Sequence, residues 1–367
     1  MDSLFNPVRV LIGEKSVSKL PSLIKNRKYV VVSSPGFESR NWNNYFLNSE
    51  YIIDTIGPNP TIGELVVHIE LLGKIKFDTL VAIGGGSVID TAKALSVFSD
   101  SSEESITECL EGNRECPSKN YDVVAIPTTA GTGAEVTSFA TIWDDKNNRK
   151  LSLYTPLIYP RNAIIDPILA LTLDSKMTAI SGLDALSHCF ESLWNKNANP
   201  LSKSMAFLAI DLILETLDPL LDNLNDLEMR SKMAWASLLG GFCINQTKTA
   251  LAHSMSYPLT SHLEIPHGLA SGAFLPEILK FNRKHDITDT VEEIYKKLSN
   301  YIPLDERLGQ LYQKLNQCNL FQRIQTNQST INSLVPQMID PERSVNNIAD
   351  ASYKDILSIL DLYFHKN

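Results

Sequence analysis

The chain has 367 residues, of which 43% are hydrophobic and 20% are charged, and its formal net charge is -9. This length exceeds what a single hydrophobic core usually organises, so we expect two domains. The acidic balance argues against sequence-independent binding of nucleic acids, which requires a basic surface that displaces counterions from phosphates.

The first half of the chain alternates short β-branched runs with helical patterns, which is typical of parallel βαβ units with helices on both faces of a sheet. In residues 61–75, Leu65, Ile69 and Leu72 recur at helical spacing, so this segment predicts a crossover helix. Strands are expected at residues 8–12, 29–33, 51–55, 80–83 and 123–126, followed by a hairpin of residues 137–143 and 150–154 and a last strand at 162–165.

Strand patterns nearly vanish after residue 174, and amphipathic runs such as 177–194 and 202–217 indicate helices instead. We therefore expect an α/β domain at residues 1–170 and an all-helical domain at residues 171–367. A ligand-binding cleft is expected between the two, because ligand sites form preferentially between domains.

Cysteine usage and hydropathy bear on the compartment. The five cysteines are odd in number and include no CxxC pair, which fits thiols kept reduced in a cytoplasm. No stretch approaches the ~18 apolar residues that a membrane span needs. Residues 1–13 contain Asp2 and Arg9 and no apolar core behind positive charge, so no secretory signal is expected. We predict a cytoplasmic protein that has neither a membrane nor a nucleic acid as partner.

Two glycine-rich turns follow neighbouring strand candidates. Gly84 to Ser87 joins a buried strand to a helix through three glycines, which let the backbone approach a ligand, while the helix N-terminus offers free N–H groups to a pyrophosphate. This is not the GxGxxG fingerprint, and alone it also fits an ordinary tight turn. A second turn, Pro127 to Thr137, is rich in glycine and hydroxyl groups. Together the two turns lie where open α/β sheets bind nucleotides.

Asp184 and His188 stand four residues apart in a predicted helix, and so lie on one face about one turn apart. A carboxylate and an imidazole placed in this way form half of a divalent-metal site, although exposed helical pairs show the same spacing. His253 and His267 lie in apolar surroundings, where an imidazole without a partner is costly to bury. One aspartate and three histidines would hold a metal that acts as a Lewis acid on a carbonyl oxygen, if a coordination position stays open.

The remaining histidines lie in other contexts. His68, His285 and His365 stand in polar or terminal segments, and we expect them to be solvated. His262, beside the turn at residues 266–267, is the histidine most easily mistaken for a ligand.

These motifs resemble those of the iron-containing (group III) alcohol dehydrogenases, and the likeness covers nearly the whole chain. The family's GGGS-x-x-D-x-x-K stands at residues 84–93, its PTTAGTG-x-EVT at 127–137, its G-x-DA-x-x-H-x-x-E at 182–191 and its PHG at 266–268. The resemblance implies a Rossmann-like α/β N-terminal domain followed by an all-helical C-terminal domain, the fold shared with dehydroquinate synthase.

The resemblance also implies the ligands, cofactor and assembly. A ferrous or zinc ion would be bound by Asp184, His188, His253 and His267, and NAD or NADP would be the cofactor. The protein would be a homodimer. The implied cofactor-binding residues are Gly85, Gly86 and Ser87 at the pyrophosphate, Thr128, Thr129 and Thr137 along the adenosine and ribose path, Asp90 of the first motif, and Lys150 at the nicotinamide end.

Two departures from the family pattern affect cofactor choice and proton transfer. Many members carry an acidic residue after the second strand, where residues 32–36 read VSSPG, so charge does not exclude NADPH here. Many members also carry a histidine four residues after the third ligand, where this chain has Tyr257. A phenol with an ordinary pKa near ~10 is a poorer proton donor than imidazole. Tyr257 and Lys150 are the residues expected at the reacting end.

The predicted function is a metal-dependent, NAD(P)H-linked alcohol dehydrogenase or aldehyde reductase. The pattern of residues 248–260, with 191–194 and 199–200, looks closest to phosphonoacetaldehyde reductases, which form 2-hydroxyethylphosphonate. A dianionic tail requires cationic or N–H donors, for which Lys248, Arg149 and Arg161 are candidates.

A nucleotide-binding pseudoenzyme is a further possibility, for which an intact set of four ligand residues is hard to explain, and two other interpretations of the function stay open. One is a simple alkanol or polyol dehydrogenase of the glycerol type. The other is a non-redox cyclase of the dehydroquinate synthase type, which typically uses one Glu and two His as metal ligands, so the Asp184 and His188 pair favours the dehydrogenase.

Overall fold

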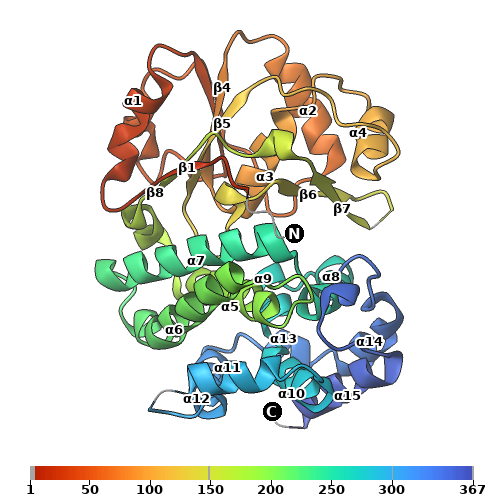
Figure 1. The fold of residues 1–367 in the computed structure, drawn as a ribbon. Coiled ribbons are helices and arrows are strands. Elements are labelled where there is room, and N and C mark those ends of the chain that lie inside the picture. The colour runs from red at the N-terminus through yellow and green to blue at the C-terminus, as the bar shows by residue number, and fades with distance from the viewer. Residues whose placement is uncertain (1–4, 148, 300, 366–367) are drawn as a thin grey trace. The chain divides into compact units, whose positions relative to one another are not determined.

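The computed structural model describes residues 5–147, 149–299 and 301–365, and these form two compact units (Figure 1). The α/β unit comprises residues 5–129 and 134–172, and the helical unit comprises residues 130–133 and the chain from residue 173 onward. The division differs from the predicted domains in two respects: Ala130–Gly133 groups with the helical unit, and the α/β unit extends to residue 172 rather than 170.

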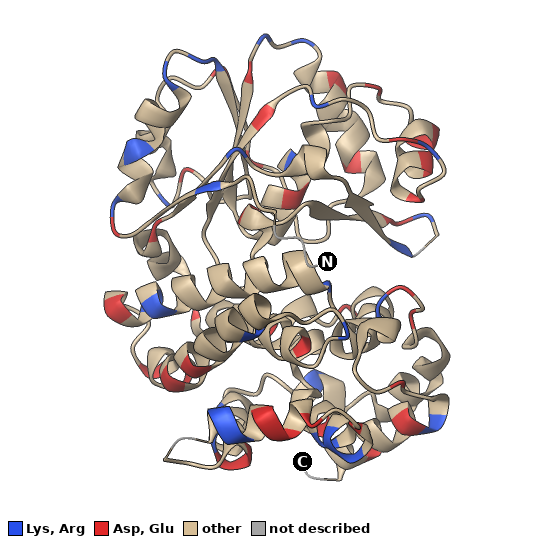
Figure 2. Ribbon diagram, viewed as in Figure 1, with Lys and Arg blue, Asp and Glu red and all other residues tan. Residues whose placement is uncertain are grey.

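The α/β unit is built on a six-stranded parallel sheet in the order β1-β8-β5-β4-β2-β3. Strands β2 and β4 are uncharged runs rich in β-branched residues and are buried at every position, as is typical of parallel sheets (Figure 2). The strands are β1 (Arg9–Ile12), β2 (Tyr29–Ser33), β3 (Tyr51–Ile53), β4 (Thr79–Gly84), β5 (Asp122–Pro127) and β8 (Asn162–Ile165).

Alternate residues of these strands enter two separate hydrophobic clusters. Val30 and Leu80 pack with α2, α3 and α4, whereas Val31 and Val81 pack with α1 and an aromatic group on the other face. The layers are therefore helix, sheet and helix. The helices are α1 (Leu20–Ile24), α2 (Ile62–Leu72), α3 (Gly86–Leu95) and α4 (Glu103–Leu110), with 3-10 turns η1 (Ser16–Lys19), η2 (Trp42–Tyr45), η3 (Ala134–Val136), η4 (Pro156–Ile158) and η5 (Pro167–Thr172).

An antiparallel hairpin of β6 (Phe139–Asp144) and β7 (Arg149–Tyr154) leaves the sheet after β5. This hairpin and all six strands of the sheet lie within two residues of their predicted bounds, and α2 lies inside the predicted crossover helix. The predicted α/β class of the N-terminal part is confirmed. One expectation was wrong: His68 is 9% exposed rather than solvated, because it lies on the buried face of α2 with Leu65 and Leu72.

The helical unit is organised around α5, which begins after Asp174, whose carboxylate accepts a hydrogen bond from the backbone N–H of Met177. Every residue from Thr178 to Leu193 is buried. The helices are α5 (Ser175–Leu193), α6 (Pro200–Asp222), α7 (Leu227–Thr247), α8 (Leu251–Leu263), α9 (His267–Gly272), α10 (Leu275–His285), α11 (Thr290–Leu298), α12 (Leu304–Gln317), α13 (Gln322–Gln325), α14 (Gln328–Ser333) and α15 (Tyr353–Phe364), with 3-10 turns η6 (Val335–Gln337) and η7 (Ser344–Asn346).

Glycines let the neighbours of α5 approach its backbone. A Cβ at Gly268 would lie 2.3 Å from the carbonyl oxygen of Ile180, and one at Gly272 would lie 2.8 Å from Leu183. Helix α9 therefore packs closely against α5 at the level of Asp184. The predicted all-helical class of the C-terminal part is confirmed, and none of the described helices has the length and apolar character needed to cross a membrane.

Candidate metal and cofactor sites

Three of the predicted metal ligands converge inside the helical unit. Asp184 and His188 lie one turn apart on α5, and His253 comes from α8. Oδ1 of Asp184 is 3.9 Å from Nε2 of His188 and 3.8 Å from Nε2 of His253, and the two imidazole rings stack at 4.8 Å. All three side chains are buried, and one donor atom from each lies within 4.8 Å of the others. Such a donor set fits one small cation.

The outer nitrogens of both imidazoles are held by the protein. Nδ1 of His188 lies 3.3 Å from the carbonyl oxygen of Gly131, and Nδ1 of His253 lies 2.6 Å from Oε2 of Glu191. Each ring therefore turns Nε2 toward Asp184. Nε2 of His253 is buried and has no hydrogen-bond partner within the described ranges. An orphaned buried nitrogen costs free energy unless something else satisfies it, and a metal ion does so.

His267 lies beside this cluster at the start of α9. Its ring contacts that of His253 edge to face at 5.2 Å, and its Nδ1 is 3.5 Å from Oγ of Ser256. It does not belong to the group of donor atoms that lie within 4.8 Å of one another. Its role as a fourth ligand stays a prediction. The Tyr257 ring stacks with the His267 ring at 5.9 Å, so the structure brings this predicted residue next to the cluster.

Burial sets the protonation of the cluster. It lowers the pKa of His188 to about 4, although the Asp184 carboxylate opposes the shift. Burial alone would raise the pKa of Glu191, but the charge and hydrogen bond of His253, with backbone donors, lower it. At neutral pH His188 is therefore neutral, the form that binds metals, and Glu191 is an ionised acceptor for His253.

Glu191 is a functional residue whose role sequence reasoning missed. It is 0% exposed and accepts hydrogen bonds from both the backbone N–H and the ring of His253. Its place three residues after His188 on α5 was the available signal, because that spacing puts it on the same helix face.

We expect Glu191→Ala to weaken metal binding about 10- to 100-fold, since the His253 ring loses the group that orients it. Competition with a chromogenic chelator measures the affinity. Glu228→Ala, on the exposed start of α7, is the matched control. Unchanged affinity in Glu191→Ala would show that His253 is oriented by other contacts.

The two glycine-rich turns meet at the carboxyl edge of the sheet in the α/β unit. Strand β4 ends at Gly84, α3 begins at Gly86, and the backbone N–H of Thr128 donates to the carbonyl of Gly84 at 2.9 Å. A Cβ at Gly84 would lie 2.5 Å from the side chain of Val88, so this turn cannot carry a side chain there. The predicted residues Gly85, Gly86, Ser87, Thr128 and Thr129 therefore border one sheet edge, at the N-terminus of α3.

Asp90 and Thr137, also predicted in the cofactor site, take part in a buried network. Lys93 is 0% exposed, and its ammonium group donates to Oγ1 of Thr137 at 2.9 Å and to the carbonyl of Phe139 at 3.0 Å. Oδ2 of Asp90 accepts from the backbone N–H of Thr141 at 2.8 Å. These contacts join α3 to the start of the hairpin. These contacts favour a structural role for Asp90 and Thr137, because their polar groups already bond to other residues of the protein.

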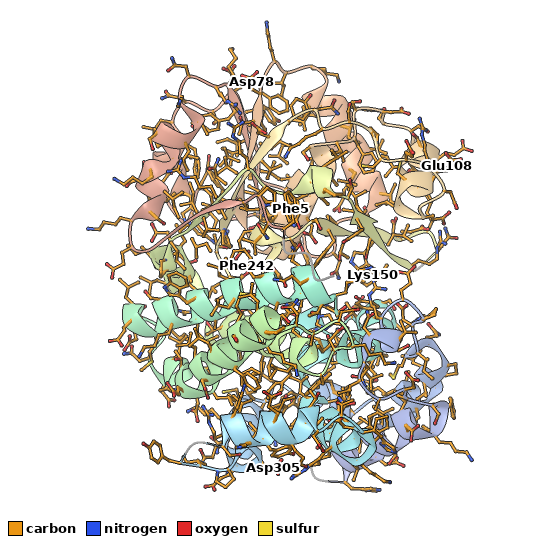
Figure 3. The ribbon with its side chains drawn as sticks, viewed as in Figure 1. Phe5, Asp78, Glu108, Lys150, Phe242 and Asp305 are labelled. Atoms are coloured by element: carbon orange, nitrogen blue, oxygen red, sulfur yellow. The ribbon has the colours of Figure 1, made fainter. Side chains whose placement is uncertain are left out.

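Lys150 lies on β7, where it pairs with Trp143 across the hairpin (Figure 3). Its charge helps to lower the pKa of Asp90, against the stronger raising effect of burial. The structure thus places Lys150 in the same electrostatic neighbourhood as the network around α3.

Two buried groups of this network titrate near neutral pH. Burial raises the pKa of Glu135 to about 7, with opposing effects from its own backbone N–H and from Lys93, and burial lowers the pKa of Lys93 to about 8. Between its usual pKa of 4.5 and about 7, the folded chain holds a proton on Glu135 that the unfolded chain has released. The contribution of Glu135 therefore lowers the free energy of unfolding as the pH rises from about 4.5 to about 7.

We expect Glu135→Gln to flatten the pH dependence of stability between about pH 4.5 and 7, because the variant has no carboxyl to titrate. Urea unfolding midpoints across this range measure the effect. Glu70→Gln, an exposed position on α2, is the control and should keep the slope of the unsubstituted protein. Parallel curves for all three proteins would contradict the assignment.

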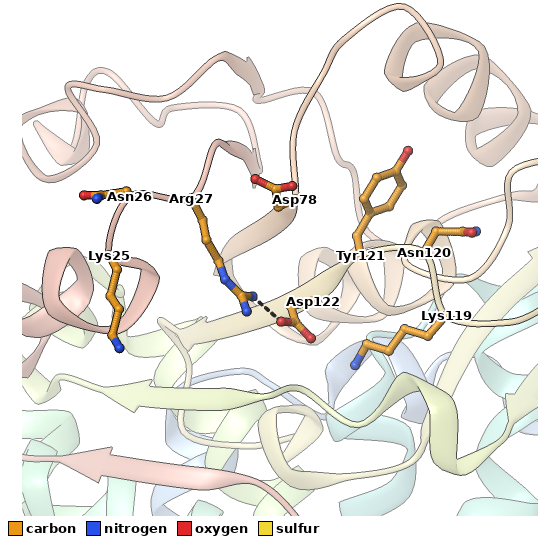
Figure 4. A pocket seen from close by; sticks show the side chains of 8 residues that line it. All are labelled: Lys25, Asn26, Arg27, Asp78, Lys119, Asn120, Tyr121 and Asp122. Carbon is orange, nitrogen blue, oxygen red and sulfur yellow. Dashed lines mark hydrogen bonds and ion pairs between the residues drawn. The ribbon is translucent and has the colours of Figure 1, made fainter.

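A surface depression of about 720 Å³ opens at the opposite edge of the sheet, before the amino ends of β2, β4 and β5 (Figure 4). Arg27 and Asp122 pair across it, and Arg161 also bonds to Asp122 at 2.8 Å. It contains none of the predicted ligand or cofactor residues.

The remaining histidines lie outside the cluster of Asp184, His188 and His253. His262 is exposed and bonds to Gln337 at 2.9 Å, and His285 and His365 are exposed as expected.

The sequence matches two family profiles that together cover most of the chain. Residues 7–167 match the family described as iron-containing alcohol dehydrogenase, and residues 178–364 match its C-terminal domain. The fold and the buried Asp and His cluster agree with that class. The chain belongs to the iron-containing alcohol dehydrogenase family.

Individual relatives differ in what they act on. Alcohol dehydrogenase 4 of Schizosaccharomyces pombe is 32% identical over 64% of this chain and 55% of its own length. The phosphonoacetaldehyde reductase of Streptomyces viridochromogenes is 35% identical over 68% of this chain and 66% of its own length. The NADPH-dependent butanol dehydrogenase of Clostridium saccharobutylicum is 33% identical over 69% of this chain and 64% of its own length. The matched part thus spans less than two thirds of the length of each of these relatives.

Solved structures match over the whole chain. Sulfoacetaldehyde reductase from Bifidobacterium kashiwanohense, in complex with NAD+, superposes with a TM-score of 0.87 at 25% identity, covering 100% of this chain and 98% of that one. An iron-containing alcohol dehydrogenase from Thermotoga maritima has a TM-score of 0.83 at 26% identity and covers 100% of both chains.

Proposed function

We propose that this protein is a metal-dependent, NAD(P)H-linked aldehyde reductase and alcohol dehydrogenase. The observation that carries the proposal is the convergence of Asp184, His188 and His253, with a buried His253 nitrogen that has no hydrogen-bond partner among the described residues. Membership of the iron-containing alcohol dehydrogenase family supports it.

Asp184, His188, His253 and His267 would hold the ion, which is Fe²⁺ or Zn²⁺ because mixed imidazole and carboxylate ligands suit both. Bound there, it would supply a Lewis acid that stabilises negative charge on the substrate oxygen. Glu191 and the carbonyl of Gly131 keep both imidazoles oriented. The fixed cluster therefore requires little reorganisation during the reaction.

The cofactor would be NAD or NADP, the source of the hydride. Backbone N–H groups of Gly85, Gly86 and Ser87 at the N-terminus of α3 would bind the pyrophosphate. Thr128 and Thr129 would contact the nucleoside, Lys150 the nicotinamide end, and Asp90 and Thr137 would act through the network around Lys93.

Tyr257 is the residue we propose to deliver the proton to the alkoxide. Burial raises the pKa of its phenol, while Arg343, whose guanidinium lies 4.5 Å above the ring, opposes that shift. The phenol is therefore protonated at neutral pH and acts as a hydrogen-bond donor.

Phosphonoacetaldehyde, reduced to 2-hydroxyethylphosphonate, is the substrate we propose. The names of two relatives support it, since phosphonoacetaldehyde and sulfoacetaldehyde are both short aldehydes with an anionic tail. Of the predicted tail-binding cations, Arg149 pairs with Asp144 and Glu111, and Arg161 pairs with Asp122. Lys248 follows α7 directly and shares the helical unit with the metal cluster, which makes it the preferred of the three.

The substrate is tested by loading the metal-free protein with Fe²⁺ or Zn²⁺ and following NADH or NADPH absorbance with phosphonoacetaldehyde, propanal and glycolaldehyde. We expect the highest kcat/KM with phosphonoacetaldehyde. A preference for propanal or glycolaldehyde would indicate an alkanol or polyol dehydrogenase. Turnover of a cyclase substrate without net NAD(P)H consumption would indicate the dehydroquinate synthase type.

The metal role is tested with His267→Ala. We expect kcat/KM to fall by about two orders of magnitude or more, and chelation to abolish turnover, because the charge on the substrate oxygen is no longer stabilised. Circular dichroism and metal content accompany the assay. His262→Ala, an exposed histidine, is the control. Full activity in His267→Ala and after chelation would remove the metal from the mechanism.

We also propose, from the family resemblance alone, that the protein acts as a homodimer. Light scattering coupled to size-exclusion chromatography measures its mass directly.

A further inference from the structure

The segment that follows β2 carries a guanidinium, that of Arg40, close to the carboxyl end of the strand. Ser34 to Gly36 leaves β2 at the carboxyl edge of the sheet, and the next residues fold back so that Nη1 of Arg40 lies 3.4 Å from Oγ of Ser34. A Cβ on Gly36 would lie 3.4 Å from the Arg40 guanidinium, so the side chain rests against this turn.

Arg40 is held in place by neutral groups, as far as the described residues show. Its guanidinium lies 4.9 Å from the ring centroid of Trp42, which is 3% exposed and packs with Phe37. Among the described residues no carboxylate pairs with Arg40, although Glu38 stands in the same turn. Most of its five N–H donors are therefore available to a ligand.

The register of the sheet places this turn next to the phosphate-binding turn. Strands β2 and β4 are neighbours, with Ser33 opposite Ile83, so residues 34–36 and 84–86 leave the same sheet edge side by side. Neighbouring strands lie about 4.8 Å apart. In dinucleotide-binding α/β folds, the ribose nearest the adenine lies beside such a neighbouring strand, where a carboxylate binds its 2'-hydroxyl or an arginine binds its 2'-phosphate.

We propose that Arg40 binds the 2'-phosphate of NADPH and makes this protein NADPH-preferring. The inference rests on the proposed function, and it names the cofactor form that the sequence left open. A planar guanidinium donates two parallel hydrogen bonds to a phosphate, whereas the unmodified ribose of NADH offers no anion. Gly36 has a φ of 91°, a backbone conformation that favours glycine, and a side chain there would press on the Arg40 guanidinium.

The direct test is binding of two nucleotide probes, adenosine 2',5'-bisphosphate and 5'-AMP, measured by calorimetry. We expect the unsubstituted protein to bind the bisphosphate about tenfold or more tightly than 5'-AMP, because the 2'-phosphate adds at least one hydrogen bond between charged groups. Arg40→Gln should lose this preference while its affinity for 5'-AMP stays the same. Equal affinity of the unsubstituted protein for both probes, or a preference retained in Arg40→Gln, would overturn the proposal.

Kinetics give an independent readout. In Arg40→Gln, KM for NADPH should rise about tenfold or more, whereas KM for NADH, KM for the aldehyde and kcat stay unchanged. Arg9→Gln is the matched control, since Arg9 is an exposed arginine at the opposite edge of the same sheet and its loss changes the net charge equally. If Arg40→Gln does not fold, Arg40→Lys serves instead. It retains the charge but not the planar fork, so a measurable loss of NADPH preference is expected.

Failure of this proposal is distinct from failure of the proposed function. Aldehyde reduction with equal or better use of NADH would overturn the role of Arg40 and leave the reductase standing. Absence of binding to either dinucleotide, with no reduction of any aldehyde, would remove both.

Discussion

The structure depends on keeping one carboxylate and two imidazoles buried together. Asp184, His188 and His253 lie in a helical unit whose central helix has no solvent face along most of its length. Polar groups in that environment are costly unless each is satisfied. Glu191 and a backbone carbonyl satisfy the outer nitrogens, and the inner ones face a common point. The packing of α5 and α8 thus brings three potential metal ligands to one candidate cation position.

In the α/β unit, close approach of the backbone acts together with a buried charge. Gly84 has no room for a side chain, and the Thr128 N–H ties the second turn to the first. The buried Lys93 then fixes the hairpin to α3. The turns bordering the proposed cofactor site are therefore set by the main chain and by contacts beneath it.

Much of this was predictable because it follows from local pattern. The alternation of buried β-branched strands, the spacing of Asp184 and His188, and the glycine-rich turns all depend on neighbours in sequence. What sequence reasoning missed depends on partners far along the chain. Glu191 has its role through His253, 62 residues away, and Lys93 through Thr137, 44 residues away. His68 was predicted to be solvated because its segment of the sequence carries charged side chains, yet it is buried. The sequence did not single out Arg40. Only the fold shows that no described carboxylate pairs with its guanidinium, which leaves it able to bind an anion.

The orientations of the His253 and His188 rings differ in whether a side-chain substitution can change them. The orientation of His253 rests on a side chain, so substituting Glu191 can tune its basicity and with it the choice of metal. His188 is oriented by the main chain at Gly131, where an added Cβ would meet the carbonyl oxygen of Ser181 at 2.8 Å. No side-chain substitution removes that carbonyl. The orientation of one imidazole of the candidate cation site can therefore be changed through a side chain, and that of the other is fixed by the course of the backbone.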